Sequence, residues 1–141
     1  MAVGARYFID TSALARLRYP EVDAVLSPLI LRGDVVTWAL LDLEILYSAR
    51  SHAELVETRA LRSRSLQMIG TEQSDFDRAT EVMFELARRG RHRAVGVSDL
   101  ITAAVAERAG VTIIHYDGDF EYVSEVTGQA VQWVVPRGSV P

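Results

Sequence analysis

Acidic residues stand at several points where one predicted element of this chain gives way to the next. Asp10 directly follows an apolar run, Tyr7–Ile9, and Asp117 follows a second, β-branched run by two residues. Asp119 stands two residues further on, and Asp99 opens a predicted helix. Because ligands bind beyond the carboxyl ends of strands in an open parallel sheet, we expect two of these carboxyl groups to meet at one rim.

Each of these acids taken alone has an ordinary structural interpretation. An Asp after a strand is often a turn residue or a helix N-cap, and an Asp at a helix start commonly complements the helix dipole. The chemical interpretation depends on the set, because carboxylates gathered without a lysine repel each other and raise one another's pKa. A hard divalent cation removes that repulsion, and ligands made only of oxygen select Mg²⁺ or Mn²⁺ over zinc or copper.

A further acid falls inside the apolar surface of a predicted helix over 39–49. On a helical wheel Glu44 lies between Leu40 and Leu41. Asp42 lies on the other side of the wheel and is also flanked by apolar positions. The wheel therefore does not choose between the two acids.

The composition excludes several kinds of chemistry. The chain of 141 residues has no Cys and no Lys, and all 15 of its basic residues are Arg. These absences exclude thiolate catalysis, zinc–thiolate and iron–sulfur sites, P-loop nucleotide binding and pyridoxal Schiff bases. A phosphoacceptor receiver domain is excluded as well, because its acidic pocket needs a Lys. Of the scattered histidines, His115 is expected to pack at a strand end and His52 to lie at the surface.

The charge and hydropathy patterns indicate where such a protein acts. A formal net charge of −4 gives the whole molecule no attraction to nucleic acid, so a polyanionic partner needs a local basic patch or a metal ion. No apolar run approaches the roughly 20 residues that a membrane span needs, and no signal peptide is recognised. We therefore expect a cytoplasmic protein without a membrane partner.

Short β-rich runs alternate with helical patterns, which predicts an α/β fold: a central parallel sheet of about four to five strands flanked by helices. Residues 1–141 are expected to form a single domain. Strands are predicted over 6–10, 35–37, 111–115 and 131–135, and helices over 12–18, 22–31, 39–49, 53–68, 75–89, 99–109 and 118–126.

Several residues are predicted to begin or end these helices. Thr11 or Ser12 is expected to cap the first helix, and Ser74 with Asp77 to form a capping box for the helix over 75–89. Ser98 is expected to cap the helix over 99–109, and the Gly that follows this helix to end it.

The chain ends on a segment, Val135–Ser139, that resembles a thrombin-cleavable linker from an expression vector. It is equally compatible with a native sequence, so it receives no role. The last few residues are expected to be either flexible or vector-derived.

Four short motifs resemble those of PIN-domain ribonucleases and, within that family, of VapC-type toxins from VapBC toxin–antitoxin systems. The resemblance covers nearly the whole chain, and four motifs in order are far more specific than any one of them. The motifs are FIDTSAL at 8–14, EILYSA at 44–49, SDLITAA at 98–104 and HYDGDF at 115–120.

The resemblance implies a role for each acid. It selects Glu44 rather than Asp42, and it implies that Asp10, Glu44, Asp99 and Asp117 are the catalytic acids, with Asp10, Asp99 and Asp117 as metal ligands. Ser12 would be a polar neighbour of the metal. Asp119 can also be aligned with the fourth acid, and we prefer Asp117 with Asp119 as a helper. Thr102 stands where the family commonly has Ala.

The same resemblance implies an activity and partners. The chain is expected to be a Mg²⁺-dependent endoribonuclease, with Mn²⁺ as a substitute, that hydrolyses RNA phosphodiester bonds. It is expected to act as a toxin, to be neutralised by a VapB-type antitoxin and to form a homodimer. The alternative is a housekeeping RNA-processing or DNA-acting nuclease of the same fold that has no antitoxin.

An arginine-rich segment, 88–93, is the predicted contact for RNA phosphates. It carries four arginines in six residues, and a guanidinium pairs bidentately with a phosphate. The alternative is a solvated helix end, since cations favour a helix C-terminus. Arg91 and Arg93, which lie beyond the predicted helix, are the stronger RNA-binding candidates.

Overall fold

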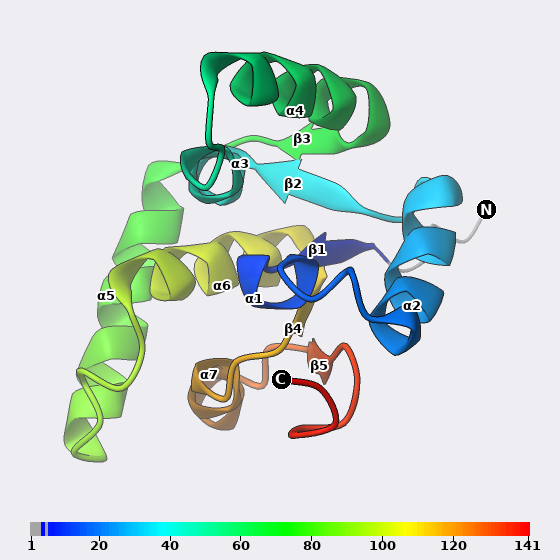
Figure 1. The fold of residues 1–141 in the computed structure, drawn as a ribbon. Helices are drawn as coiled ribbons and strands as arrows, with labels where there is room; N and C mark the ends of the chain where they lie inside the picture. The colour runs from blue at the N-terminus through cyan, green and yellow to red at the C-terminus, as the bar shows by residue number, and fades with distance from the viewer. Residues whose placement is uncertain (1–3, 5) are drawn as a thin grey trace.

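The structure is a computed structural model that describes residue 4 and residues 6–141, and Figure 1 shows strands flanked by helices. The strands are β1 (Tyr7–Ile9), β2 (Val36–Trp38), β3 (Gln67–Ile69), β4 (Thr112–His115) and β5 (Val131–Trp133). The helices are α1 (Thr11–Leu14), α2 (Pro20–Leu31), α3 (Ala39–Tyr47), α4 (His52–Ser65), α5 (Gln73–Arg88), α6 (Val97–Ala109) and α7 (Asp119–Thr127). Among the helices described, none combines the length and apolar character that crossing a membrane requires.

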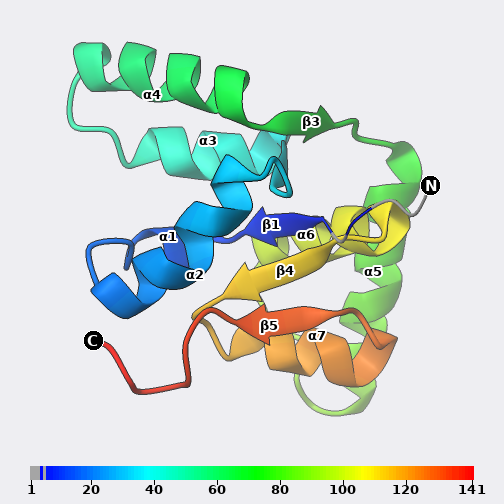
Figure 2. The ribbon, with the colours of Figure 1, turned by 90° about the vertical axis from the view of Figure 1, so that its right-hand side faces the viewer.

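The predicted parallel α/β architecture is confirmed. Strands β1, β4 and β5 form one parallel sheet in that order, and β2 and β3 form a second parallel pair. An isolated bridge between Tyr7 and Val35 joins the two sheets. In the register of β1 with β4, Ile9 lies opposite Ile114, so the residues that follow each strand emerge side by side. The arrowheads of β1, β4 and β5 point to the same edge in Figure 2.

The helix predicted over 53–68 is wrong at its C-terminal end. Helix α4 ends at Ser65, and Leu66 is extended with φ −127° and ψ 135°. Residues Gln67–Ile69 then pair with β2 as a strand that the sequence did not predict. The backbone of β2 would otherwise leave N–H and C=O groups unpaired on this side, and this pairing outweighs a helical pattern carried by mostly exposed positions.

Several helices start earlier than predicted, and at α1 and α5 the side chains that reach the free N–H groups stand earlier in the chain than expected. Asp10, rather than Thr11 or Ser12, caps α1, and α1 ends at Leu14 instead of residue 18. The other corrected helix starts are a Glu72–Asp75 capping box for α5 in place of Ser74–Asp77, and Gly96 before α6, with Ser98 inside the first turn.

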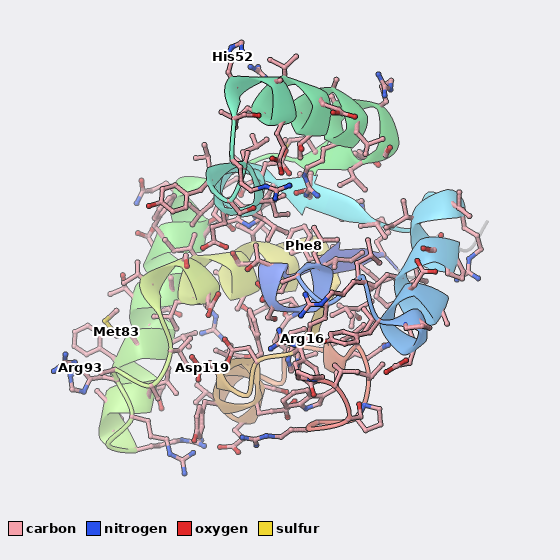
Figure 3. The ribbon with its side chains drawn as sticks, in the orientation of Figure 1. Phe8, Arg16, His52, Met83, Arg93 and Asp119 are labelled. Carbon is pink, nitrogen blue, oxygen red and sulfur yellow. The ribbon has the colours of Figure 1, made fainter. Side chains whose placement is uncertain are left out.

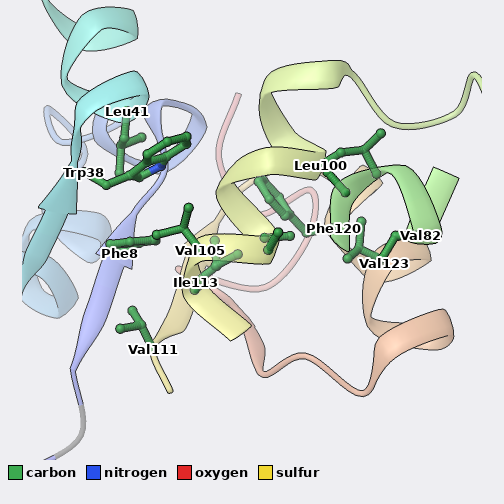
Figure 4. Close-up of a cluster of buried hydrophobic side chains, with 14 of the residues drawn as sticks. Phe8, Trp38, Leu41, Val82, Leu100, Val105, Val111, Ile113, Phe120 and Val123 are labelled. Carbon is green, nitrogen blue, oxygen red and sulfur yellow. The ribbon is translucent and has the colours of Figure 1, made fainter. Parts of the chain in front are cut away.

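The main core forms where α6 packs between the sheet and α5 (Figure 4). Helix α6 is buried along a small-residue face that includes Ala103 and Ala106, which lets neighbouring backbones approach closely. Thr102 is buried in the same face, and its hydroxyl accepts a hydrogen bond from Nε1 of Trp38 at 3.2 Å. Gly110 ends the helix as predicted, with φ +67° in the left-handed region.

Helix α4 has no buried residue, and it is held to the domain largely through one arginine. The Nε and Nη2 atoms of Arg62 donate to Oδ1 of Asp42 at 3.0 and 2.9 Å, and Nη2 also donates to Oγ1 of Thr37 at 3.2 Å. Figures 1 and 2 both show α4 stacked outside α3. The ion pair is only 13% and 20% exposed on its two side chains, so solvent screens it weakly.

We expect Arg62→Ala to loosen α4 before the rest of the molecule. Loss of the half-buried ion pair should lower the free energy of unfolding by about 2 kcal/mol. Hydrogen exchange should show reduced protection confined to the amides of α4 and β3. Arg59→Ala, an exposed change on the same helix, is the control, and equal effects of the two changes would contradict this role for Arg62.

Candidate metal centre

Strand pairing fixes Asp10 at the carboxyl edge of the sheet. Its backbone N–H donates to the carbonyl of Ile114 at 2.9 Å, so the β1–β4 ladder continues one residue past the strand. Its Oδ2 accepts from the N–H of Ser12 at 3.0 Å and from the Ser12 hydroxyl at 2.6 Å. Asp10 is 4% exposed, so the N-cap interpretation is correct and the carboxyl group is also buried at the predicted rim.

Ser12 links the two strand ends that carry acids. Its hydroxyl donates to Asp10 and accepts from the backbone N–H of Tyr116 at 2.9 Å. This hydroxyl therefore orients the Asp10 carboxylate and ties it to the loop after β4. Its predicted role beside a metal stays a prediction.

The loop after β4 carries two acids that are coupled through the backbone. The N–H of Asp119 donates to Oδ1 of Asp117 at 3.0 Å, which holds the Asp117 carboxylate over the start of α7. The N–H of Asp117 donates to Nδ1 of His115 at 3.1 Å, so a neutral His115 ring carries its proton on Nε2. Figure 3 places Asp119 at the start of α7.

His115 is a packing residue, as predicted. The ring is fully buried between Phe120 and Trp133, at centroid distances of 5.2 and 4.8 Å. Burial lowers the pKa of His115, while the Glu121 carboxylate, 3.6 Å from Nε2, opposes that shift. His52, also as predicted, is exposed, on α4 at the outer edge of the molecule in Figure 3.

Helix α6 brings Asp99 to the acids of the β4 loop. One carboxylate oxygen from each of Asp99, Asp117 and Asp119 lies within 4.8 Å of the others, and all three residues are half-buried. This grouping juxtaposes both candidates for the fourth acid with Asp99. It therefore favours a site in which Asp119 takes part alongside Asp117.

The two acids of α3 have different surroundings. Asp42 is engaged by Arg62, as described above, and faces away toward α4. Glu44 instead lies close enough to raise the pKa of both Asp10 and Asp99. Glu44 therefore lies near the acidic group, and the catalytic role that the resemblance implies for it stays a prediction.

Burial and the repulsion between like charges raise the pKa of three of these acids. Burial, followed by the carboxylates of Asp10, Asp117, Glu44 and Asp119, raises the pKa of Asp99 to about 7. Burial also raises the pKa of Asp10, although the hydrogen bonds from Ser12 oppose the shift. The pKa of Asp119 is raised by burial and by Asp117. Among the residues that the structure describes, none of these five carboxylates has an arginine partner. Uncompensated oxygen ligands of this kind suit a hard divalent cation.

A groove of about 280 Å³ opens beside the acids, between α1 and α3. Glu44 contributes to its wall, so the groove lies next to the acidic group. Its lining residues are Thr11, Leu14, Ala15, Glu44, Ile45 and Ser48.

The arginines predicted to contact RNA do not converge on this site. Arg91 donates to Glu125 at 3.0 Å and lies over the ring of Tyr122, 4.7 Å from its centroid. Arg93 is exposed, and Figure 3 shows it at the outer edge of the molecule, well apart from Asp119. RNA binding by this pair stays a prediction.

One arginine for which the sequence predicted no role does reach the rim. The Arg137 guanidinium lies over Gly118, the residue that separates Asp117 from Asp119 in the loop after β4. The signal that could have found it is its position: Arg137 follows β5 closely, and parallel strands end at the same edge of the sheet.

The raised pKa of Asp99 predicts how stability depends on pH without metal. Between about pH 4 and pH 7 the folded protein binds more protons at Asp99 than the unfolded chain, so stability should fall as pH rises through this window and level off above it. Asp99→Asn removes the charge. In EDTA at pH 8 we expect this variant to melt about 3–5 °C above the wild type, and at pH 5 to melt close to it.

Thermal unfolding in EDTA at both pH values measures this effect. Asp77→Asn, an exposed change on α5, is the control and should show no such difference. A lower melting temperature for Asp99→Asn at pH 8 would mean that Asp99 acts only as a helix-start acid.

Comparisons with known proteins agree with this geometry. A model of the PIN domain matches residues 7–126. The chain is 40% identical to Ribonuclease VapC21 of Mycobacterium tuberculosis over 134 residues, which cover 95% of this chain and 97% of that protein. Ribonuclease VapC51 of the same organism is 36% identical over 135 residues, which cover 96% of this chain and 97% of that protein.

VapBC2 from Rickettsia felis, solved bound to a DNA fragment from its promoter, contains a chain with the same fold. That chain matches with a TM-score of 0.71 and 14% identity, across 89% of this chain and 96% of its own. The match to the PIN-domain model and the identity to these relatives show that the chain belongs to the PIN-domain family.

Proposed function

We propose that this chain is a Mg²⁺-dependent endoribonuclease that cleaves RNA in the cytoplasm. The observation that carries the proposal is the meeting of Asp99, Asp117 and Asp119, with Asp10 and Glu44 beside them and, among the described residues, no arginine to neutralise them. The relatives named ribonucleases support RNA as the substrate.

The residues present fit a divalent cation. Asp10, Asp99 and Asp117 would hold the ion, and Asp119 would assist or take the place of Asp117, because its carboxylate lies near those of Asp99 and Asp117. When bound, Mg²⁺ would supply Lewis-acid activation of a water molecule and neutralise the charge on the phosphate.

The chain's own residues would do the remaining work. Ser12 holds Oδ2 of Asp10, whereas Oδ1 accepts no hydrogen bond from the described part of the chain, so that oxygen can face the ion. Asp99 would give up its proton as the ion binds, because a ligating carboxylate must be ionised. Glu44 stands at the open groove, where one of its carboxylate oxygens can accept the proton that the attacking water loses.

In the cell, this nuclease would act as a toxin whose activity an antitoxin blocks. The solved VapBC structures, in which a PIN fold is accompanied by a partner, support it. The groove between α1 and α3 would receive an apolar segment of a VapB-type antitoxin beside Glu44, blocking access to the acids. A housekeeping nuclease with the same site is the alternative.

The predicted homodimer belongs to the same proposal. Helices α5 and α6 expose large apolar side chains, with Phe84 66% and Val97 65% exposed. Such a face is unusual on a protein that works alone, so a second copy of the chain would cover it.

Cleavage of a labelled single-stranded RNA tests the enzymatic part. Mg²⁺ should support cleavage by the wild type, EDTA should abolish it, and Asp99→Asn should reduce the rate on the order of 100-fold or more. Asp77→Asn should cleave like the wild type. Cleavage that persists in EDTA would remove the metal from the proposal, and a wild type that cuts no RNA would end it.

Expression of the chain alone in a bacterial host tests the biological part. Wild-type expression should arrest growth and generate new RNA ends, whereas Asp99→Asn should allow normal growth. Coexpression of a small gene that neighbours this one should restore growth. Harmless expression of an enzyme that cuts RNA in vitro would favour the housekeeping nuclease instead.

A further inference from the structure

The C-terminal segment is built into the edge of the acidic site. The Tyr116 hydroxyl donates to the carbonyl of Val140 at 2.7 Å and accepts from the N–H groups of Gly138 and Val140 at 2.9 and 3.3 Å. Val135 and Val140 are buried, the latter 5% exposed. Residues 134–141, called the C-terminal strap below, are thus anchored on both sides of Arg137. Figure 2 shows the strap leaving β5 at the edge to which the arrowheads point.

Arg16 fastens the end of the strap to α1. Its Nε donates to the carbonyl of Pro141 at 2.8 Å, and its Nη1 donates to the carbonyl of Ser12 at 2.6 Å. Its guanidinium also lies 4.4 Å from the centroid of the Tyr116 ring. The residue that orients Asp10 and the strap that carries Arg137 are therefore connected through one side chain.

The guanidinium of Arg137 lies flat over the loop between Asp117 and Asp119. A methyl group placed on Gly118 would be 3.8 Å from Cζ and from both terminal nitrogens of Arg137, so the plane of the group faces the glycine. On another side the guanidinium is 5.7 Å from the centroid of the Trp133 ring. With one face against the glycine, the N–H groups of the guanidinium have no acceptor among residues 6–141.

No carboxylate of the described residues pairs with Arg137, although two acids flank the glycine beneath it. Its side chain is exposed and makes no hydrogen bond within residues 6–141. By contrast, Asp117 accepts from a backbone N–H and shares its space with Asp99. Arg137 is therefore a permanent cation beside the acidic site that pairs with none of its carboxylates. It is available to bind an anion that comes from another molecule.

We propose that Arg137 binds an RNA phosphate at the rim of the acidic site, next to the bond that is cut. This inference rests on the proposed ribonuclease function and adds a substrate-binding residue to it. A planar guanidinium with a free edge suits two parallel hydrogen bonds to phosphate oxygens. Trp133 and the loop fix its orientation, which limits the side-chain entropy lost on binding.

Phosphate is favoured over a carboxylate of a protein partner by what surrounds Arg137. The acids beneath it repel another protein carboxylate, whereas they would hold the cation that neutralises a phosphate. The groove suited to a protein segment is a separate feature, between α1 and α3, and Arg137 does not line it. Arginines farther away, such as Arg91, are engaged in ion pairs.

Binding of a fluorescein-labelled single-stranded RNA, measured in EDTA over a series of salt concentrations, tests the inference without cleavage. Arg137→Gln should raise Kd about tenfold at low salt. It should also reduce the slope of log K against log salt by about 0.7, the value for one lost phosphate contact on a single strand. Arg137→Lys should keep the slope but raise Kd, because the charge remains and the bidentate geometry is lost.

Two further variants separate binding from folding. Arg32→Gln changes an exposed arginine paired with Asp34 at the opposite edge of the sheet and should leave Kd and slope unchanged. Tyr116→Phe removes the anchor of the strap but no charge, and it should weaken RNA binding while the salt slope falls only in part. Melting temperatures of all variants would be measured alongside.

Wild-type cleavage of the same RNA with Mg²⁺ distinguishes the possible failures. If the wild type cleaves and Arg137→Gln binds with unchanged Kd and slope, the inference is overturned while the proposed function stands. The inference is likewise overturned if Arg137→Gln only lowers the melting temperature, because Arg137 would then serve the packing of the strap. If the wild type neither binds nor cleaves RNA, both are overturned.

Discussion

Mutual repulsion among five carboxylates is the constraint on which the rest of this structure depends. Asp99 is held with its pKa near 7 by burial and by four neighbouring acids, none of which has an arginine partner among the described residues. The fold opposes this repulsion with the β1–β4 ladder, the Ser12 bridge and the buried small-residue face of α6. A divalent cation would turn the same arrangement from a destabilising one into a stabilising one.

The distribution of arginines preserves that constraint. Arginines on α4, α5, α6 and the α5–α6 loop are paired with acids outside the site. The pairs are Arg62–Asp42, Arg78–Glu107, Arg108–Asp75 and Arg91–Glu125. Three of these bridges join two helices and the fourth joins the α5–α6 loop to α7, and together they leave the carboxylates at the sheet edge uncompensated. A chain without lysine can therefore keep a strongly acidic site inside a molecule whose formal net charge is only −4.

Strong local patterns made part of this site predictable. The runs before Asp10 and Asp117 are β-branched or aromatic, so both acids could be placed at strand ends and, by parallel pairing, at one edge. Strand β3 was missed because Gln67–Ile69 is short and mostly exposed, and its pairing with β2 is a long-range contact. Glu44 could not be separated from Asp42 by a helical wheel, because the difference lies in Arg62, on another helix. Arg137 was missed because the strap that holds it resembles a linker.

Exchange of a proton for a divalent cation at the clustered acids is the central claim. Calorimetric titration of Mg²⁺ at pH 6.5 and pH 8.5, in buffers with different heats of ionisation, measures the protons released on binding. Because the pKa of Asp99 is about 7, we predict release of a large fraction of one proton at pH 6.5 and little at pH 8.5. Asp99→Asn should abolish the release. Binding without proton release at either pH, or binding that survives Asp99→Asn unchanged, would contradict the claim.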